Sequence, residues 1–162
     1  MRIAIIAASF IAFFAAAPAR AEELSITVNK ALELRSALAE MSAGAPTIVK
    51  DGERQSVAMQ PFTLTPAVRA ALAKDTLRLD AALETSMKEL RALGQKLCPN
   101  DKCDDESRAE RDRQSQAIGD RKLALDLIPF TESELNMEKN AGLTPRLLGM
   151  LSPLLPFLKE KN

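Results

Sequence analysis

The 162-residue chain has no histidine, no tryptophan and no tyrosine, and it has only two cysteines and six glycines. Histidine is the commonest general base and the commonest metal ligand, so its absence argues against ordinary acid–base catalysis and against a metal site. The sequence contains no glycine-rich phosphate loop and no dinucleotide-binding fingerprint. We therefore predict a protein that is not an enzyme and that uses no cofactor or metal.

Neither sign of charge is in excess, because 22 Lys and Arg residues stand against 22 Asp and Glu residues. Apolar residues make up 46% of the chain, which is ordinary for one folded domain. Aromatic residues make up only 4%, too few for a surface that stacks bases. The composition therefore gives no reason to expect a nucleic-acid partner.

The first 21 residues have the pattern of a cleavable secretory signal. Arg2 precedes an apolar run at 3–17, Pro18 follows, and an Ala-Arg-Ala tripeptide ends at Ala21. We expect cleavage after Ala21, which places residues 22–162 in the periplasm or outside the cell. An uncleaved anchor is the alternative, but the run is shorter than the roughly 20 residues that a membrane span needs.

Cleavage leaves a chain with a net charge of −2, because both arginines of the signal are removed with it. This balance favours neither nucleic acid nor an anionic membrane as a partner. No stable membrane span is expected after cleavage.

Residues 22–162 are predicted to form a single mainly α domain with a minor antiparallel β element. Apolar residues at spacings of three and four predict a helix over 28–42. Thr27 is a suitable cap for its start, and Gly44 is a suitable end.

A β hairpin is predicted near 47–64. Asp51-Gly52 is a strong turn signal between candidate strands at 47–50 and 56–64. Pro61 lacks a backbone donor, so the second strand is expected to lie at an edge or to bend there.

The longest predicted helix covers residues 66–97 and starts at Thr65-Pro66. Its apolar stripe has a near-heptad spacing, as in coiled coils, with leucines at Leu72, Leu79, Leu83, Leu90 and Leu97. A helix of this length extends roughly 45 Å. We therefore expect an elongated helical hairpin or bundle around it, and the face of Leu72, Leu79, Leu83 and Leu90 is a candidate surface for a homo-oligomer.

Cys98 and Cys103 follow this helix directly. An exported protein meets an oxidising compartment, so we predict a structural disulfide between them. A metal site needs further ligands that the chain lacks, and redox enzymes use a Cys-x-x-Cys spacing instead.

A second helix is predicted over 104–122, with charges of both signs, followed by a strand at 123–130. The mixed charges are interpreted as a solvated surface, with a charged docking face as the alternative. The tripeptide Pro-Phe-Thr occurs at both 61–63 and 129–131. The repeat suggests that these two segments lie side by side in one small sheet.

The C-terminal region has two interpretations. Thr144-Pro145 again predicts a helix start, and apolar residues dominate 147–158. These residues are expected to pack over the long helices, since large exposed apolar patches are rare on monomers. The alternative is that they dock on a partner or a membrane.

Carboxylates cluster in two polar stretches, at Asp104, Asp105 and Glu106 and at Glu132 and Glu134. Nothing in the sequence places either group in an apolar cleft, so solvated carboxylates are expected.

The order of several short motifs resembles a group of small phage and prophage-type helical proteins of unknown function. The similarity covers about residues 26–158, and the matching segments are 26–32, 49–52, 61–65, 73–74 and 147–155. The group implies no activity that can be transferred to this chain. A second likeness is to periplasmic helical-hairpin chaperones and metal-stress sensors, which carry a Leu-Thr-x-x-Gln turn. Leu64-Thr65 and Leu143-Thr144 share its Leu-Thr start but lack the Gln.

Three functions follow from these observations. The first is an exported interaction or structural protein that acts through its helix faces. The second is a chaperone-like or stress-related binder of apolar segments, with a groove flanked by the helix at 28–42 and the C-terminal leucines. The third is an enzyme with carboxylate chemistry.

Overall fold

Helices dominate the computed structural model, which describes residues 22–51, 54–99 and 102–159. The helices are α1 (Val28–Ala43), α2 (Pro66–Leu97), α3 (Asp105–Gly119), α4 (Glu132–Leu135), α5 (Pro145–Leu151), the 3₁₀ turn η2 (Ser152–Leu154) and α6 (Pro156–Lys159). The strands are β1 (Glu22–Thr27), β2 (Ala45–Asp51), β3 (Arg54–Gln60) and β4 (Lys122–Leu127). A mainly α fold with a minor antiparallel β part is therefore confirmed. The predicted signal segment lies outside the described residues.

The helix starts follow from local sequence chemistry. The hydroxyls of Thr27, Thr65 and Thr144 each accept a hydrogen bond from the backbone N–H three residues later. Pro66 and Pro145 occupy the first helical position, where a missing N–H costs nothing. The predicted helices at 28–42 and 66–97 have these starts and end within a residue of their predicted positions.

The strands form two separate antiparallel pairs, β1 with β4 and β2 with β3. The prediction that 61–63 and 129–131 lie side by side in one sheet is wrong, because each segment follows a strand of a different pair. Strand β3 ends one residue before Pro61, and strand β4 ends two residues before Pro129. Proline has no N–H to donate to a strand ladder. The phenylalanines Phe62 and Phe130 are nonetheless buried in one shared core.

The core lies between α1, the N-terminal two thirds of α2, the β1–β4 pair and the C-terminal segment. Leu72, Leu79 and Leu83 are at most 2% exposed. They therefore belong to the core of the single chain and do not form the homo-oligomer surface that the heptad spacing suggested. Leu90 lies beyond the core and is partly exposed.

The C-terminal segment also packs into this core. Four leucines, Leu147, Leu151, Leu154 and Leu155, are almost fully buried, and α5 packs against α1. The first interpretation of 147–158 is confirmed. The leucines that were predicted to flank a groove beside the first helix are themselves buried in the core.

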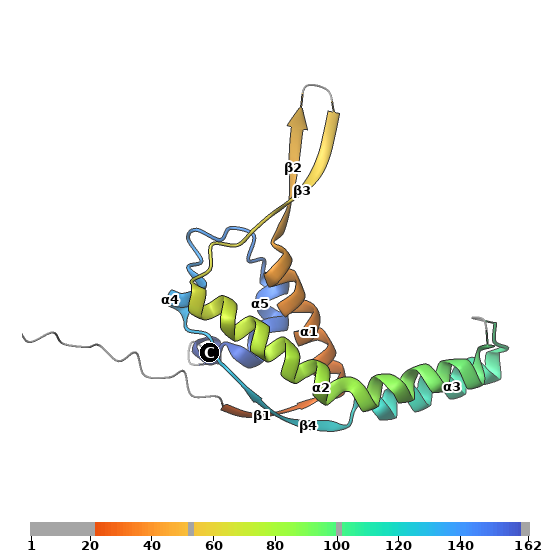
Figure 1. The fold of residues 1–162 in the computed structure, drawn as a ribbon. Helices are drawn as coiled ribbons and strands as arrows, with labels where there is room; N and C mark the ends of the chain where they lie inside the picture. The colour runs from red at the N-terminus through yellow and green to blue at the C-terminus, as the bar shows by residue number, and fades with distance from the viewer. Residues whose placement is uncertain (1–21, 52–53, 100–101, 160–162) are drawn as a thin grey trace, which may run out of the picture.

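Two features project from this core (Figure 1). The β2–β3 hairpin extends away on one side, and the C-terminal part of α2 extends with α3 on another. An ion pair between Arg121 and Glu89 joins the end of α3 to α2. No helix in the described ranges combines the length and the apolar character that a bilayer crossing requires.

Candidate functional site

The β2–β3 hairpin is the most exposed apolar feature of the described chain, and we refer to its strands, residues 45–51 and 54–60, as the arm. Side chains alternate between the two faces of a strand, so directly paired residues share a face. Ile48 pairs with Val57, and Pro46 pairs with Met59. All four apolar side chains therefore lie on one face of the arm.

This apolar face is open to solvent. Ile48 is 65% exposed, Val57 is 72% exposed and Met59 is 50% exposed. Val49, on the opposite face, is 44% exposed. Large apolar side chains gathered at this exposure mark an interaction surface more often than a structural one.

The arm also has an unprotected edge. Each of its strands has one pairing neighbour among the described residues, so each leaves one edge free. Pro46 has no N–H to donate to β3, so we take Pro46 and Met59 as a non-hydrogen-bonded pair. Hydrogen-bonded and non-hydrogen-bonded pairs alternate along an antiparallel ladder. The backbone N–H and C=O groups of Gln55, Val57 and Met59 therefore point away from β2, toward the free edge. Residues 55–60 contain neither proline nor charge, the usual protections of an edge strand.

The root of the arm is held in a fixed geometry. The side-chain oxygen of Asn140 accepts the N–H of Thr63 at 2.7 Å, and its amide donates to the carbonyls of Thr63 at 3.1 Å and Leu135 at 2.7 Å. Asn140 is buried, so these three bonds replace water completely. They attach the chain leaving the arm to the loop that precedes α5.

Gly44 fixes the other strand of the root. Its φ of 97° lies in the region that favours glycine, and a Cβ there would lie 2.3 Å from the carbonyl oxygen of Gln60. The backbones at Gly44 and Gln60 therefore lie closer together than any residue with a Cβ at position 44 would allow. With the bonds of Asn140, this contact sets the direction in which the arm projects.

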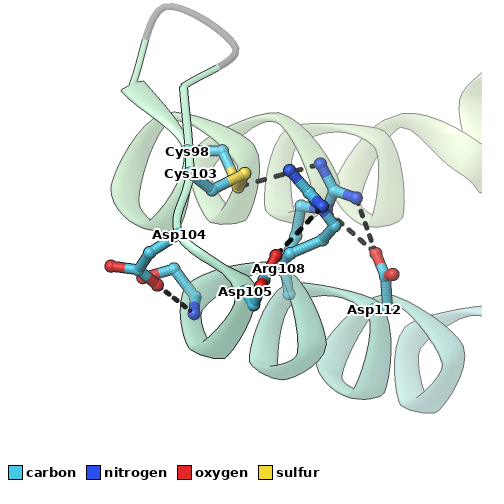
Figure 2. The surroundings of a disulfide bond; sticks show 8 residues. Cys98, Cys103, Asp104, Asp105, Arg108 and Asp112 are labelled. Carbon is cyan, nitrogen blue, oxygen red and sulfur yellow. Dashed lines mark hydrogen bonds and ion pairs between the residues drawn. A yellow bond between two sulfur atoms is a disulfide. The ribbon is translucent and has the colours of Figure 1, made fainter.

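The two cysteines form the predicted disulfide (Figure 2). Cys98 and Cys103 are joined with a Cα–Cα distance of 4.6 Å, at the turn between α2 and α3. Cys98 is the C-terminal cap of α2, and its N–H donates to Gly94. Asp104 caps α3 by accepting the N–H of Ser107 at 2.7 Å.

Asp75 is a buried carboxylate that the sequence analysis missed. It is 0% exposed, and its two oxygens accept the backbone N–H of Ile128 at 3.1 and 3.2 Å. Desolvation raises the pKa of Asp75 to about 6, against the opposing effects of the Ile128 hydrogen bond and of Arg78 at 3.7 Å. Since its oxygens are enclosed and partnered, Asp75 joins α2 to the end of β4 and offers no access to a substrate.

The carboxylates singled out from the sequence are surface groups. The pKa of Asp104 is lowered, chiefly because its carboxylate accepts the Ser107 N–H at the start of α3. Glu134 completes a capping box with Thr131 at the start of α4. No group of three or more potential metal-ligating side chains occurs in the ranges that the structure describes.

Part of this arrangement was visible in the sequence. The Asp51-Gly52 turn and its flanking strands predicted the hairpin, although not that it stands apart from the core. No local signal marks its exposure, because the fold alone decides whether another element covers a hairpin. Asp75 and Asn140 carry no local signal, because their partners lie 53 and 77 residues away.

Comparisons of the chain with protein-family models, with curated proteins and with solved structures find no significant match in any of the three. The similarity to phage and prophage-type proteins therefore stays a prediction. The functional argument depends on the residues of this chain alone.

Proposed function

We propose that this chain is an exported, non-enzymatic interaction protein that binds another protein through the arm. The observation that carries the proposal is the open apolar face of Ile48, Val57 and Met59 on a hairpin whose root is fixed. A rigid root means that a partner need not order the arm's direction when it binds, which lowers the entropic cost of association.

The exposed area favours a partner other than a second copy of this chain. Full burial of one aliphatic side chain removes about 60–120 Å² of apolar surface from water, so the three side chains supply at most about 360 Å². Contact between two such faces would then bury at most about 720 Å² of apolar side-chain surface, well below the roughly 1,200 Å² of a stable specific interface. We therefore assign the apolar face of the arm to an apolar surface on a second exported protein, where a strand of the partner pairs with the free edge of β3.

The rest of the chain is proposed to form an elongated support for this contact. The 32 residues of α2 give it a length of about 48 Å at 1.5 Å per residue. α2 packs on α1 in the core and on α3 beyond it, and this supports the idea of an extended helical bundle. Export to the periplasm or beyond follows from the signal pattern at 1–21, and the mature chain is expected to start at Glu22.

Site-specific photo-crosslinking in cells that export the chain tests the proposal. A photoreactive residue at position 57 should give a discrete adduct that contains a second protein, whereas one at 58, on the opposite face, should give much less. The double substitution I48T/V57T keeps β-branched side chains but adds hydroxyls to the apolar face. It should remove an adduct formed through a photoreactive residue at position 59.

Ala58→Thr is the matched control, because it adds the same polar group on the other face of the same strand. Equal adducts at 57 and 58 would contradict the proposal, as would an adduct that contains only a second copy of this chain or only phospholipid. Adducts with many unrelated unfolded proteins would support the chaperone alternative instead.

A further inference from the structure

The two sulfurs of the disulfide differ in access. Cys98 is 5% exposed, whereas Cys103 is partly open to solvent. Thiol–disulfide exchange requires an attacking thiolate to reach one sulfur while the other leaves. Steric access therefore directs an incoming thiolate to Cys103 Sγ.

The two sulfurs also differ in electrostatic surroundings. Nη1 of Arg111, one turn further along α3 than Arg108, lies 3.7 Å from Cys98 Sγ. The same guanidinium is held in place by Asp112, which accepts from its Nε at 3.0 Å and from its Nη2 at 2.7 Å. Figure 2 shows the disulfide together with Asp112 and with Arg108, which is directed to Asp105.

A cation at this distance stabilises the sulfur that becomes negative. Guanidinium charge beside a thiol lowers the pKa of the thiol, and a thiol of lower pKa leaves faster from a disulfide. Asp112 reduces this effect but does not remove it, because the guanidinium retains an N–H that points to sulfur. Access and charge thus favour the same direction of cleavage.

We propose that Cys98–Cys103 is a reducible clip with a fixed polarity, in which a thiolate attacks Cys103 and Cys98 leaves beside Arg111. The attacking thiolate can come from a small thiol or from the Cys-x-x-Cys pair of an exported oxidoreductase. Its sulfur forms a bond to Cys103 Sγ while the Cys103–Cys98 bond breaks. The electron pair of that bond stays on Cys98 as thiolate, and a second thiol of the reductant then resolves the mixed disulfide. In this scheme Arg111 is a positioning residue.

Cleavage would release the end of α2 from the start of α3. The disulfide joins Cys98, the C-terminal cap of α2, to Cys103, the residue just before the N-terminal cap Asp104 of α3. This release lies in the projecting α2–α3 part, on a different side of the molecule from the arm (Figure 1). The inference is therefore independent of the proposed function of the arm.

The test is a reaction of the folded full mature chain with reduced glutathione, quenched at early times with iodoacetamide. Peptide mass spectrometry should find glutathione on Cys103 and the alkyl group on Cys98, in clear excess over the reverse pattern. The same reaction in guanidinium chloride should lose this preference, because the fold no longer shields Cys98. A majority of glutathione on Cys98 in the folded protein would overturn the proposal.

The role of Arg111 is tested by the rate of the first exchange step. Without the cation beside it the Cys98 sulfur is a poorer leaving group, so the Arg111→Gln variant should react about three- to tenfold more slowly. Arg111→Lys should restore most of the rate. Arg108→Gln is the control, since Arg108 pairs with Asp105 on the same helix.

Circular dichroism of each variant confirms that the fold is kept. Arg111→Gln reacting at the rate of Arg108→Gln would refute the role assigned to Arg111. The site of glutathione attachment tests the polarity separately, even if Arg111→Gln proves unstable.

Discussion

The buried carboxylate of Asp75 makes stability depend on pH in a direction opposite to that of most acidic residues. Its pKa is about 6 in the folded chain, and 3.8 is the ordinary value for an exposed aspartate. Between these two pH values the unfolded chain has lost the proton and the folded chain still holds it. The free energy of unfolding therefore falls as pH rises through this window. The contribution of Asp75 to stability is complete below about pH 4, is lost between about pH 4 and pH 6, and does not change further above that.

The size of the effect follows from the shift. A difference of about two pKa units corresponds to about 3 kcal/mol at 1.36 kcal/mol per unit. Asp75 is 0% exposed, so solvent does not screen this cost. The Arg78 ion pair and the Ile128 hydrogen bond already oppose the shift, so the value of about 6 is what remains after both.

Asp75→Asn isolates the contribution of this group. Asparagine keeps an oxygen that can accept the Ile128 N–H, but it cannot ionise. Both proteins are unfolded in urea at intervals from pH 4 to pH 7.5. The free energy of unfolding of the variant, minus that of the natural chain, should increase by about 3 kcal/mol as pH rises. The carboxyl resonance of Asp75 should titrate with a midpoint near 6.

Asp126→Asn is the control, since Asp126 is 64% exposed in its side chain and lies near the same Arg78. It should change the pH profile only slightly. A difference between Asp75→Asn and the natural chain that stays constant with pH, or that changes with the opposite sign, would refute the desolvation argument.

Four further outcomes are expected. Leu83→Ala should destabilise the chain by about 2–5 kcal/mol in urea unfolding, whereas Leu77→Ala on the same helix should change stability by less than about 0.5 kcal/mol, because Leu83 is buried and Leu77 is 70% exposed. Asn140→Ala should cost about 1–3 kcal/mol, since it leaves the buried carbonyl of Leu135 without its partner and releases the N–H and carbonyl of Thr63, and faster amide exchange at Thr63 should accompany the loss. Gly44→Ala should destabilise the chain by more than about 1 kcal/mol, whereas the same change at an unstrained site stabilises by about 0.4–1 kcal/mol, and a change within experimental error would contradict the close contact with Gln60. The denatured chain, without reductant, should show no free thiol, and two titratable thiols would contradict the disulfide.

The helix and hairpin positions could be predicted because their causes are local. A threonine hydroxyl reaches a backbone N–H three residues away, and a proline at the first helical position needs no partner elsewhere. An Asp-Gly turn brings its own flanking strands together. The same reasoning placed the disulfide, since two cysteines with four residues between them cannot lie far apart.

Burial was predicted correctly only in part. The near-heptad leucines of α2 indicated one apolar face, but the spacing alone does not say whether that face meets a second chain or the same one. In the structure α1 and the C-terminal leucines cover it, and the predicted oligomer surface disappears. The arm shows the opposite case, because its alternating pattern is typical of a half-buried strand and yet no other described element covers it.

The sequence by itself determined where the three helices with threonine caps begin, where the two sulfurs join, and that the chain has few of the groups used in catalysis. Only the tertiary structure decided that β1 pairs with β4, that Asp75 loses its water, and that Asn140 holds the root of the arm. The physical reason is the range of the interactions. Caps and turns are fixed by atoms within a few residues, whereas desolvation and strand pairing depend on which distant segments fold against each other.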